Sequence, residues 1–191
     1  MVTTKKQLNN ADFKEAAKQL GVSVAVVKAV RDVEAPRGGF LRYNNEPTIL
    51  FERHKFHQFT SGVYSTKYPD ISNARPGGYI GYSQEHLRMQ KAAKLNREAA
   101  LKSTSWGLFQ IMGFNYKMCG YQTLQMFIND MYLSEKKQLM AFVEFVKSVN
   151  LQDELQRLDW HGFARNYNGK NYRKNKYAKR LANAYKKYEK V

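Results

Sequence analysis

Residues 99–113, Ala-Ala-Leu-Lys-Ser-Thr-Ser-Trp-Gly-Leu-Phe-Gln-Ile-Met-Gly, form the most distinctive stretch of this 191-residue chain. Large apolar side chains gather in its second half, so we predict a buried helix over residues 104–112 that packs through Trp106, Leu108, Phe109 and Ile111. Gly107 lies within this stretch and permits close approach of another backbone or of a ligand.

Two further helices are predicted near the start of the chain. The first begins at about Asn10 and ends before Gly21, a residue type that is frequent just after a helix. Ser23 is the expected N-cap of the second, in which valines recur at spacings of three and four residues (Val26, Val27, Val30 and Val33). This apolar stripe buries one face and places Glu34 in the last turn, before Pro36 and two glycines end the helix.

The remaining chain predicts a small β/loop segment followed by helices. Residues 47–59 favour a strand because they are rich in β-branched and aromatic side chains, and residues 60–82 indicate loop with short strands. Helices are predicted at 84–101, 121–132, 135–149, 151–157, 160–168 and 174–189, with Ser134 and Asp159 as N-caps and Gly169 as a C-cap. We therefore expect a mostly α, α+β fold with a large helical lobe, a small β/loop lobe and a cleft between them.

Three segments stand in an order that carries a family resemblance. They are Ala29-Val-Arg-Asp-Val-Glu34, Ser105-Trp-Gly-Leu-Phe-Gln-Ile-Met-Gly113 and Phe163-Ala-Arg-Asn-Tyr-Asn-Gly169. Together they resemble the lysozyme superfamily, and the last two are similar to its lytic transglycosylase and goose-type branches. That resemblance implies a lysozyme-like fold and cleavage of a glycan.

A closer resemblance is to the N-acetylmuramidase domain of bacteriophage and prophage endolysins. It is carried by the runs 47–54 and 68–72 and by the long stretch 99–113, and it extends from about Leu8 to Tyr185. It implies a single catalytic domain over residues 1–191 that hydrolyses the β-1,4 bond between N-acetylmuramic acid and N-acetylglucosamine in peptidoglycan. The sequence departs from the family pattern at residues 35–37 and 170–171, where no catalytic group is removed.

The resemblance implies that Glu34 is the acid that protonates the glycosidic oxygen. A carboxyl at the C-terminal end of a helix lies beside unpaired carbonyls, which disfavour its ionised form. Glycoside hydrolysis usually needs a second carboxylate, and we expect it to be Glu52, on the predicted strand, or Asp70, in the loop segment. Alternatively, Glu52 is an ion-pair partner and Asp70 caps a turn. If neither reaches the cleft, the acetamido group of the substrate can assist, which opens a route to an anhydro sugar in place of a reducing end.

The same resemblance implies a set of substrate-binding residues: Trp106, Gln110, Tyr167 and Asn168. Gln110 is expected on the cleft floor near the N-acetyl group, and the Tyr167 hydroxyl is expected to hydrogen-bond Glu34. We expect no metal and no cofactor, because His54 and His57 would lie on opposite faces of a strand.

Composition restricts the compartment and the partners. The formal net charge of +16 favours polyanionic partners, and the single cysteine, Cys119, excludes an internal disulfide. With no secretory signal and no apolar run long enough to span a membrane, we expect a monomer in the host cytoplasm that reaches the wall through a holin-type pore. No separate wall-binding domain is recognisable.

Residues 174–191 are expected to form a basic amphipathic helix. An apolar stripe at helical spacing, formed by Tyr177, Leu181, Ala184, Tyr185 and Tyr188, is expected to dock on the core. The basic face is a candidate contact for anionic membrane lipid or lipopolysaccharide. Two alternatives to hydrolysis remain open: a lytic transglycosylase that yields 1,6-anhydro products, and a non-enzymatic cationic membrane-active protein. No nucleic-acid module is recognisable, so nucleic acid is not an expected partner.

Overall fold

The computed structural model describes residue 5 and residues 7–35, 38–169, 173 and 176–190. Its elements, in chain order, are α1 (Asn10–Leu20), α2 (Val24–Glu34), β1 (Ile49–Phe51), α3 (Arg53–Phe59), α4 (Tyr82–Ala93), α5 (Arg97–Lys102), β2 (Thr104–Trp106), β3 (Ile111–Met112), η1 (Gly113–Asn115), α6 (Leu124–Leu133), α7 (Glu135–Ser148), α8 (Gln152–Gln156), α9 (Trp160–Asn168) and α10 (Tyr177–Glu189). The positions at which the sequence departs from the family pattern lie largely outside these described residues.

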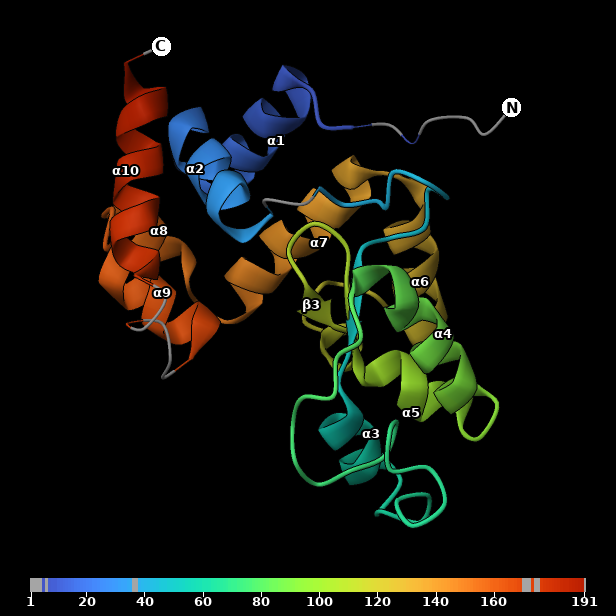
Figure 1. The fold of residues 1–191 in the computed structure, drawn as a ribbon. Coiled ribbons are helices and arrows are strands. Elements are labelled where there is room, and N and C mark those ends of the chain that lie inside the picture. The colour runs from blue at the N-terminus through green and yellow to red at the C-terminus, as the bar shows by residue number, and fades with distance from the viewer. Residues whose placement is uncertain (1–4, 6, 36–37, 170–172, 174–175, 191) are drawn as a thin grey trace.

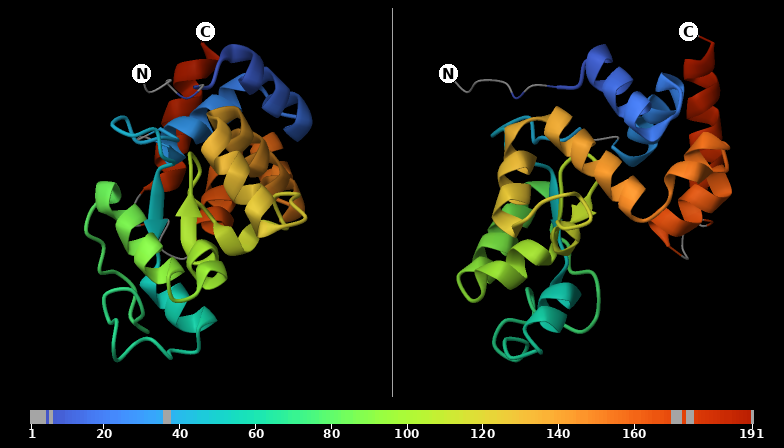
Figure 2. Two further views of the ribbon diagram at one scale, coloured as in Figure 1. Left: turned by 90° about the vertical axis from the view of Figure 1, so that its right-hand side faces the viewer. Right: turned by 180° about the vertical axis from the view of Figure 1, so that it is seen from behind.

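The elements form two lobes (Figure 1). Helices α1, α2, α8, α9 and α10 gather on one side, the strands and α3–α6 lie on the other, and α7 runs from one group to the other (Figure 2). One cluster of buried apolar side chains extends through both lobes, from Leu20 and Val30 to Phe51 and Trp106. The expected mostly helical α+β fold is therefore confirmed.

The first two helices form largely as the sequence indicates, but the Ser23 side chain makes no capping hydrogen bond at the start of α2. Asn9 and Asp12 form a capping box at the start of α1, and Gly21 ends that helix with a φ of 66°. The four valines of the stripe on α2 are all buried, and Glu34 is the last residue of that helix.

The stretch 104–112 is not the expected helix. It forms strands β2 and β3 of an antiparallel sheet of order β1-β2-β3, in which β2 pairs with both neighbours and Ile49 of β1 lies opposite Trp106. The chain reverses between the strands because Gly107 and Gln110 adopt positive φ angles of 67° and 50°. The apolar side chains are buried as predicted, but they project from a hairpin.

The predicted strand over 47–59 is also only partly correct, because it ends at Phe51. Glu52 is the N-cap of α3, and its carbonyl accepts hydrogen bonds from the backbone N–H groups of Lys55 and Phe56 at 3.0 and 3.1 Å. Phe56 is fully buried, so the second half of the segment packs as a helix. The helix predicted over 84–101 is interrupted, because the Asn96 side chain caps α5 through the Ala99 N–H at 3.0 Å.

Helix α10 packs along α2 and α9, at the end of the described chain (Figure 1). Ala178 and Leu181 are buried, while Tyr177, Ala184 and Tyr185 pack partly buried against the core. The Tyr188 hydroxyl donates to the Asp32 carboxylate of α2 at 2.6 Å. The predicted docking of the apolar stripe is confirmed, whereas residues 174–175 and 191 of the predicted segment lie outside the described part.

Candidate active site

A cleft of about 390 Å³ lies between the end of α2 and the β2–β3 hairpin. The segment before β1, η1 and helices α7, α9 and α10 complete its walls. Its lining consists of Val33, Glu34, Ala35, Gly38, Thr48, Gly107, Leu108, Phe109, Gln110, Ile111, Met112, Asn115, Phe145, Tyr167, Tyr177 and Arg180. Among these described lining residues, Glu34 is the single carboxylic acid, so any acid chemistry of this cleft centres on it.

The position of Glu34 follows from its helix. The buried valine stripe fixes α2 in the core, and its last residue, Glu34, is half-buried where the helix reaches the cleft. The negative end of the helix dipole disfavours a carboxylate there, whereas the Arg180 guanidinium, which lines the same cleft, favours one.

Tyr167, on α9, lies beside this carboxyl. Burial and then the charge of Glu34 raise the pKa of Tyr167 well above its ordinary value. Its hydroxyl donates to the Phe109 carbonyl at 3.0 Å, so its one proton is used within the hairpin. The hydroxyl proton is therefore directed to the hairpin, and the expected donation from Tyr167 to Glu34 is not seen between these two described residues.

Gln110 lines the cleft as the resemblance implies, and its side chain also braces the hairpin. Its Oε1 accepts from the Ser105 hydroxyl at 2.9 Å. Its Nε2 donates to the carbonyls of Thr48 and Gly107 at 3.0 and 2.8 Å. These contacts fix the positive-φ turn of the hairpin and hold it against the segment before β1.

Two buried polar residues of α7 hold the cleft walls together. The Gln138 amide accepts from the Leu108 N–H at 2.7 Å and donates to the Gly39 carbonyl at 3.3 Å, while the Glu135 carboxylate accepts from the Gly39 N–H at 2.8 Å. The hairpin and the segment after Glu34 are thus tied to one helix. The sequence analysis did not single out either residue, although an amide or acid on the apolar face of a helix indicates a buried polar contact.

Helix α10 contributes two cleft residues that the sequence did not assign to the site: Tyr177, which was expected in the docking stripe, and Arg180. Tyr177 and Arg180 line the cleft. The Arg180 guanidinium donates to the Val33 carbonyl at 3.2 Å and lies over the Tyr177 ring at 5.2 Å. Helix α10 therefore positions the last turn of α2 and is part of the site wall.

The outcome differs for two of the expected substrate-binding residues, Trp106 and Asn168. Trp106 is 1% exposed, and its indole N–H donates to the Leu101 carbonyl at 3.1 Å. A side chain so enclosed is part of the core, and it does not line the cleft. The side chain of Asn168 lies outside the described part of the structure.

Neither expected second carboxylate lines the cleft. The Tyr79 hydroxyl lies 2.9 Å from both carboxylate oxygens of Glu52, and His54 lies 3.2 Å from one of them. Asp70 pairs with Lys91 at 2.7 Å. Burial raises the pKa of Asp70, but the hydrogen bond and charge of Lys91 outweigh it and leave the pKa below its ordinary value. Both acids are engaged in the small lobe, as the ion-pair alternative describes for Glu52.

The described residues contain no group of three side chains that could hold a metal ion. His54 and His57 lie on helix α3 and not on a strand as expected, and His57 hydrogen-bonds the Ser65 hydroxyl at 2.7 Å. Burial raises the pKa of the Cys119 thiol to about 12, so this thiol stays protonated near neutral pH. Within the described chain, no helix is long and apolar enough to cross a bilayer.

Comparisons with known proteins give a family match and a similar solved structure. A family model described as N-acetylmuramidase matches residues 23–189, a range that contains the whole described cleft. The crystal structure of the Burkholderia AP3 phage endolysin is similar, with a TM-score of 0.91 and 39% sequence identity, over 97% of this chain and 73% of that chain. Curated proteins give no match.

Proposed function

Because the chain belongs to the N-acetylmuramidase family, we propose that it cleaves the β-1,4 bond between N-acetylmuramic acid and N-acetylglucosamine, with Glu34 as the general acid. Membership makes the chain a peptidoglycan muramidase. The observation that carries the role of Glu34 is its place as the one acid among the described residues that line the cleft. The muramidase activity follows from the family, whereas the bond that is cleaved and the role of Glu34 are proposed.

In the proposed reaction, Glu34 gives its proton to the glycosidic oxygen while the bond from that oxygen to the anomeric carbon breaks. The end of the α2 dipole favours the protonated carboxyl before the reaction. Gln138 and Arg180 keep the segments on either side of Glu34 in place. Precise positioning of the acid is worth as much as its acidity.

The oxocarbenium-like carbon must then be captured by a nucleophile. Since neither Glu52 nor Asp70 lines the cleft, we propose that the acetamido group of the substrate assists and that water completes hydrolysis. The polar side chains of Thr48, Gln110 and Asn115 lie along the same cleft and are available to orient that group and the water. The same lack of a second acid among the described lining residues favours one alternative, a lytic transglycosylase in which the 6-hydroxyl of muramic acid attacks instead.

Product analysis separates these outcomes. Purified sacculi are digested with the protein, one half of the products is reduced with borohydride, and both halves are analysed by mass spectrometry. Hydrolysis at the proposed bond yields reducible N-acetylmuramic acid ends. Products with 1,6-anhydromuramic acid ends, which borohydride leaves unchanged, would establish the transglycosylase, and reducible N-acetylglucosamine ends would assign a different bond.

We also propose an endolysin role, which the likeness to the Burkholderia AP3 phage endolysin supports. The protein would accumulate in the host cytoplasm and reach the wall through a holin-type pore. Expression in a bacterial host with and without a co-expressed holin tests this route, because lysis is then expected only with the holin. Lysis without the holin would contradict it.

Contact with anionic membrane lipid or lipopolysaccharide is a separate proposal for α10. Its apolar stripe is docked against the core, so any contact would use the exposed basic face and not insertion. Such binding to anionic vesicles would be lost at high salt, because screening shortens the Debye length to about 3 Å at 1 M. Binding that persists at 1 M salt would contradict this surface mode.

A further inference from the structure

A second cavity of about 540 Å³ lies between the start of α9 and the start of α10. It is lined by Leu158, Asp159, Trp160, His161, Arg173, Lys176, Tyr177, Ala178, Lys179 and Ala182. Tyr177 lines this cavity and also the catalytic cleft. The two hollows are therefore neighbours that share one side chain.

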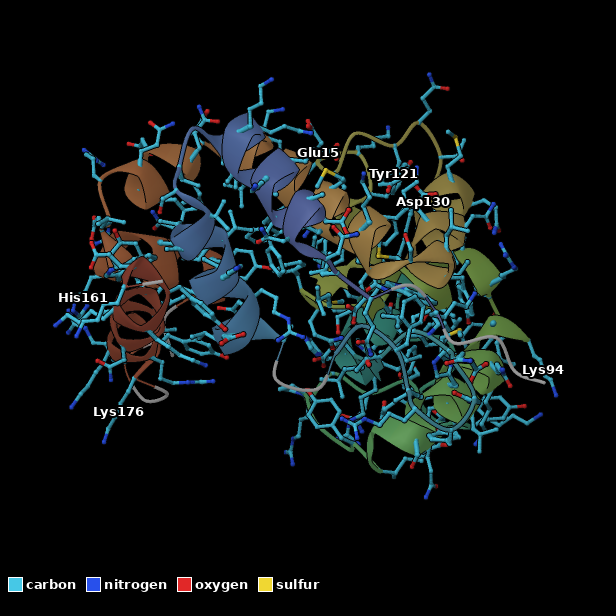
Figure 3. All side chains as sticks on the ribbon, turned by 90° about the horizontal axis from the view of Figure 1, so that it is seen from above. Glu15, Lys94, Tyr121, Asp130, His161 and Lys176 are labelled. Atoms are coloured by element: carbon cyan, nitrogen blue, oxygen red, sulfur yellow. The ribbon has the colours of Figure 1, made fainter. Side chains whose placement is uncertain are left out.

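The walls of this cavity are cationic. Arg173, Lys176 and Lys179 carry permanent positive charge, and His161 adds another when it is protonated. His161 and Lys176 lie on the same side of the molecule, beside α10 (Figure 3), and Lys176 is the residue before that helix begins. The one acid of the lining, Asp159, accepts a hydrogen bond from the Gly162 N–H at 2.9 Å and so caps α9. Positive charge thus dominates the described lining.

An aromatic side chain adds an apolar wall. Trp160 is half-buried, and its ring packs against Tyr185 with centroids 5.6 Å apart. Leu158 and two alanines of α10 extend this surface. A cavity that combines an aromatic wall with several cations suits an organic anion with an apolar part, and suits a neutral sugar less well.

We propose that this cavity binds the acidic stem peptide of peptidoglycan. The peptide branches from muramic acid, and its free carboxylates match the cations, while its alanine and side-chain methylenes match the apolar wall. A glycan strand in the cleft would carry such a branch beside the cavity, because Tyr177 lines both hollows. The inference rests on the proposed function, and it makes the first turn of α10 a determinant of substrate choice.

Charge reversal tests the site against long-range electrostatics. Lys176→Glu/Lys179→Glu changes two cavity residues, and Lys186→Glu/Lys190→Glu makes the same change in net charge at exposed residues of the same helix segment that do not line the cavity. Each protein is assayed on glycan strands that carry stem peptides and on strands from which an amidase has removed them. We expect the activity ratio of peptide-bearing to peptide-free strands to fall about tenfold in the cavity variant and to keep its wild-type value in the control. An equal fall in both variants would overturn the site.

Binding can also be followed without catalysis. Trp160 lines the cavity, whereas Trp106 is buried in the core. Titration with a soluble stem tripeptide should therefore change the Trp160 fluorescence of the wild type and of Lys186→Glu/Lys190→Glu. It should leave the fluorescence of Lys176→Glu/Lys179→Glu unchanged. Titration with inorganic phosphate is the comparison. A response to phosphate without a response to the peptide would overturn the proposal. If the protein cleaves neither type of strand, the proposed function fails, and this titration alone decides the peptide site.

Discussion

The guanidinium of Arg180 donates a hydrogen bond of 3.2 Å to the carbonyl of Val33, the residue before Glu34. The two partners are 147 positions apart in the sequence, and the contact places the C-terminal helix against the last turn of the helix that carries the acid. Helix α10 therefore supports the last turn of α2 and forms part of the cleft wall.

Arg180→Ala should lower kcat on purified peptidoglycan by about tenfold, since small displacements of a catalytic group are costly. The kcat of Arg180→Lys should lie between those of the wild type and Arg180→Ala, because lysine keeps the charge but not the planar donor group. Because Arg180 is exposed, we expect the Tm to change by only a few degrees, since about 1 kcal/mol or less is involved. Unchanged kcat and KM in Arg180→Ala would contradict the positioning role.

Gly107→Ala tests how tightly Gln138 packs against the β2–β3 hairpin. A Cβ at Gly107 would lie 2.6 Å from Cδ of the buried Gln138, and the residue has a φ of 67°. We expect a loss of about 3 kcal/mol in the free energy of unfolding, from overpacking and a strained backbone together.

Gly120→Ala is the matched control for this change. It has a φ of 82°, but its nearest neighbour is Glu144 Cγ at 3.7 Å. It should therefore lose only the backbone part, about 1 kcal/mol. Urea unfolding of both variants gives the comparison, and equal losses would show that the contact with Gln138 carries no cost.

Part of this arrangement is readable from the sequence. The valine stripe of α2, the capping residues Ser134 and Asp159, and the apolar stripe of α10 are local patterns, and local patterns predict helices well. Glu34 at the end of α2 follows from the same pattern.

The rest depends on contacts between distant segments. Residues 104–112 form a hairpin because β1 pairs with β2 and Gln110 braces the turn, and an apolar run does not show its strand partner. The contacts of Gln138 with Gly39 and of Arg180 with Val33 span 99 and 147 residues. No local spacing predicts such pairs.

Glu52→Gln tests whether the second carboxylate expected from the sequence takes part. Since Glu52 holds Tyr79 in the small lobe, we expect activity within about twofold of wild type and a loss of about 1–2 kcal/mol in unfolding free energy, as for a hydrogen bond to a charged group. Asp70→Asn, at the other candidate, is the parallel variant. A loss of about 100-fold or more in activity with unchanged stability would instead identify Glu52 as a catalytic group.

Tyr167→Phe should change the dependence of stability on pH. Burial and then the charge of Glu34 raise the pKa of Tyr167 in the folded protein, so the unfolded chain loses the phenol proton first, at about pH 10. The stabilisation by the neutral phenol is complete below that pH and is lost above it, at up to about 1.4 kcal/mol per pH unit. Urea unfolding between pH 8 and 11 should show a shallower alkaline decline in Tyr167→Phe, and identical declines would contradict the assignment.

Glu34→Gln tests the central claim most directly. The variant keeps the size of the side chain but has no proton of suitable acidity, so the rate of clearing purified peptidoglycan should fall by at least about 100-fold. The Tm, measured on the same samples, should stay within a few degrees of wild type, since one half-buried group is altered. Clearing at close to the wild-type rate by folded Glu34→Gln would contradict the account.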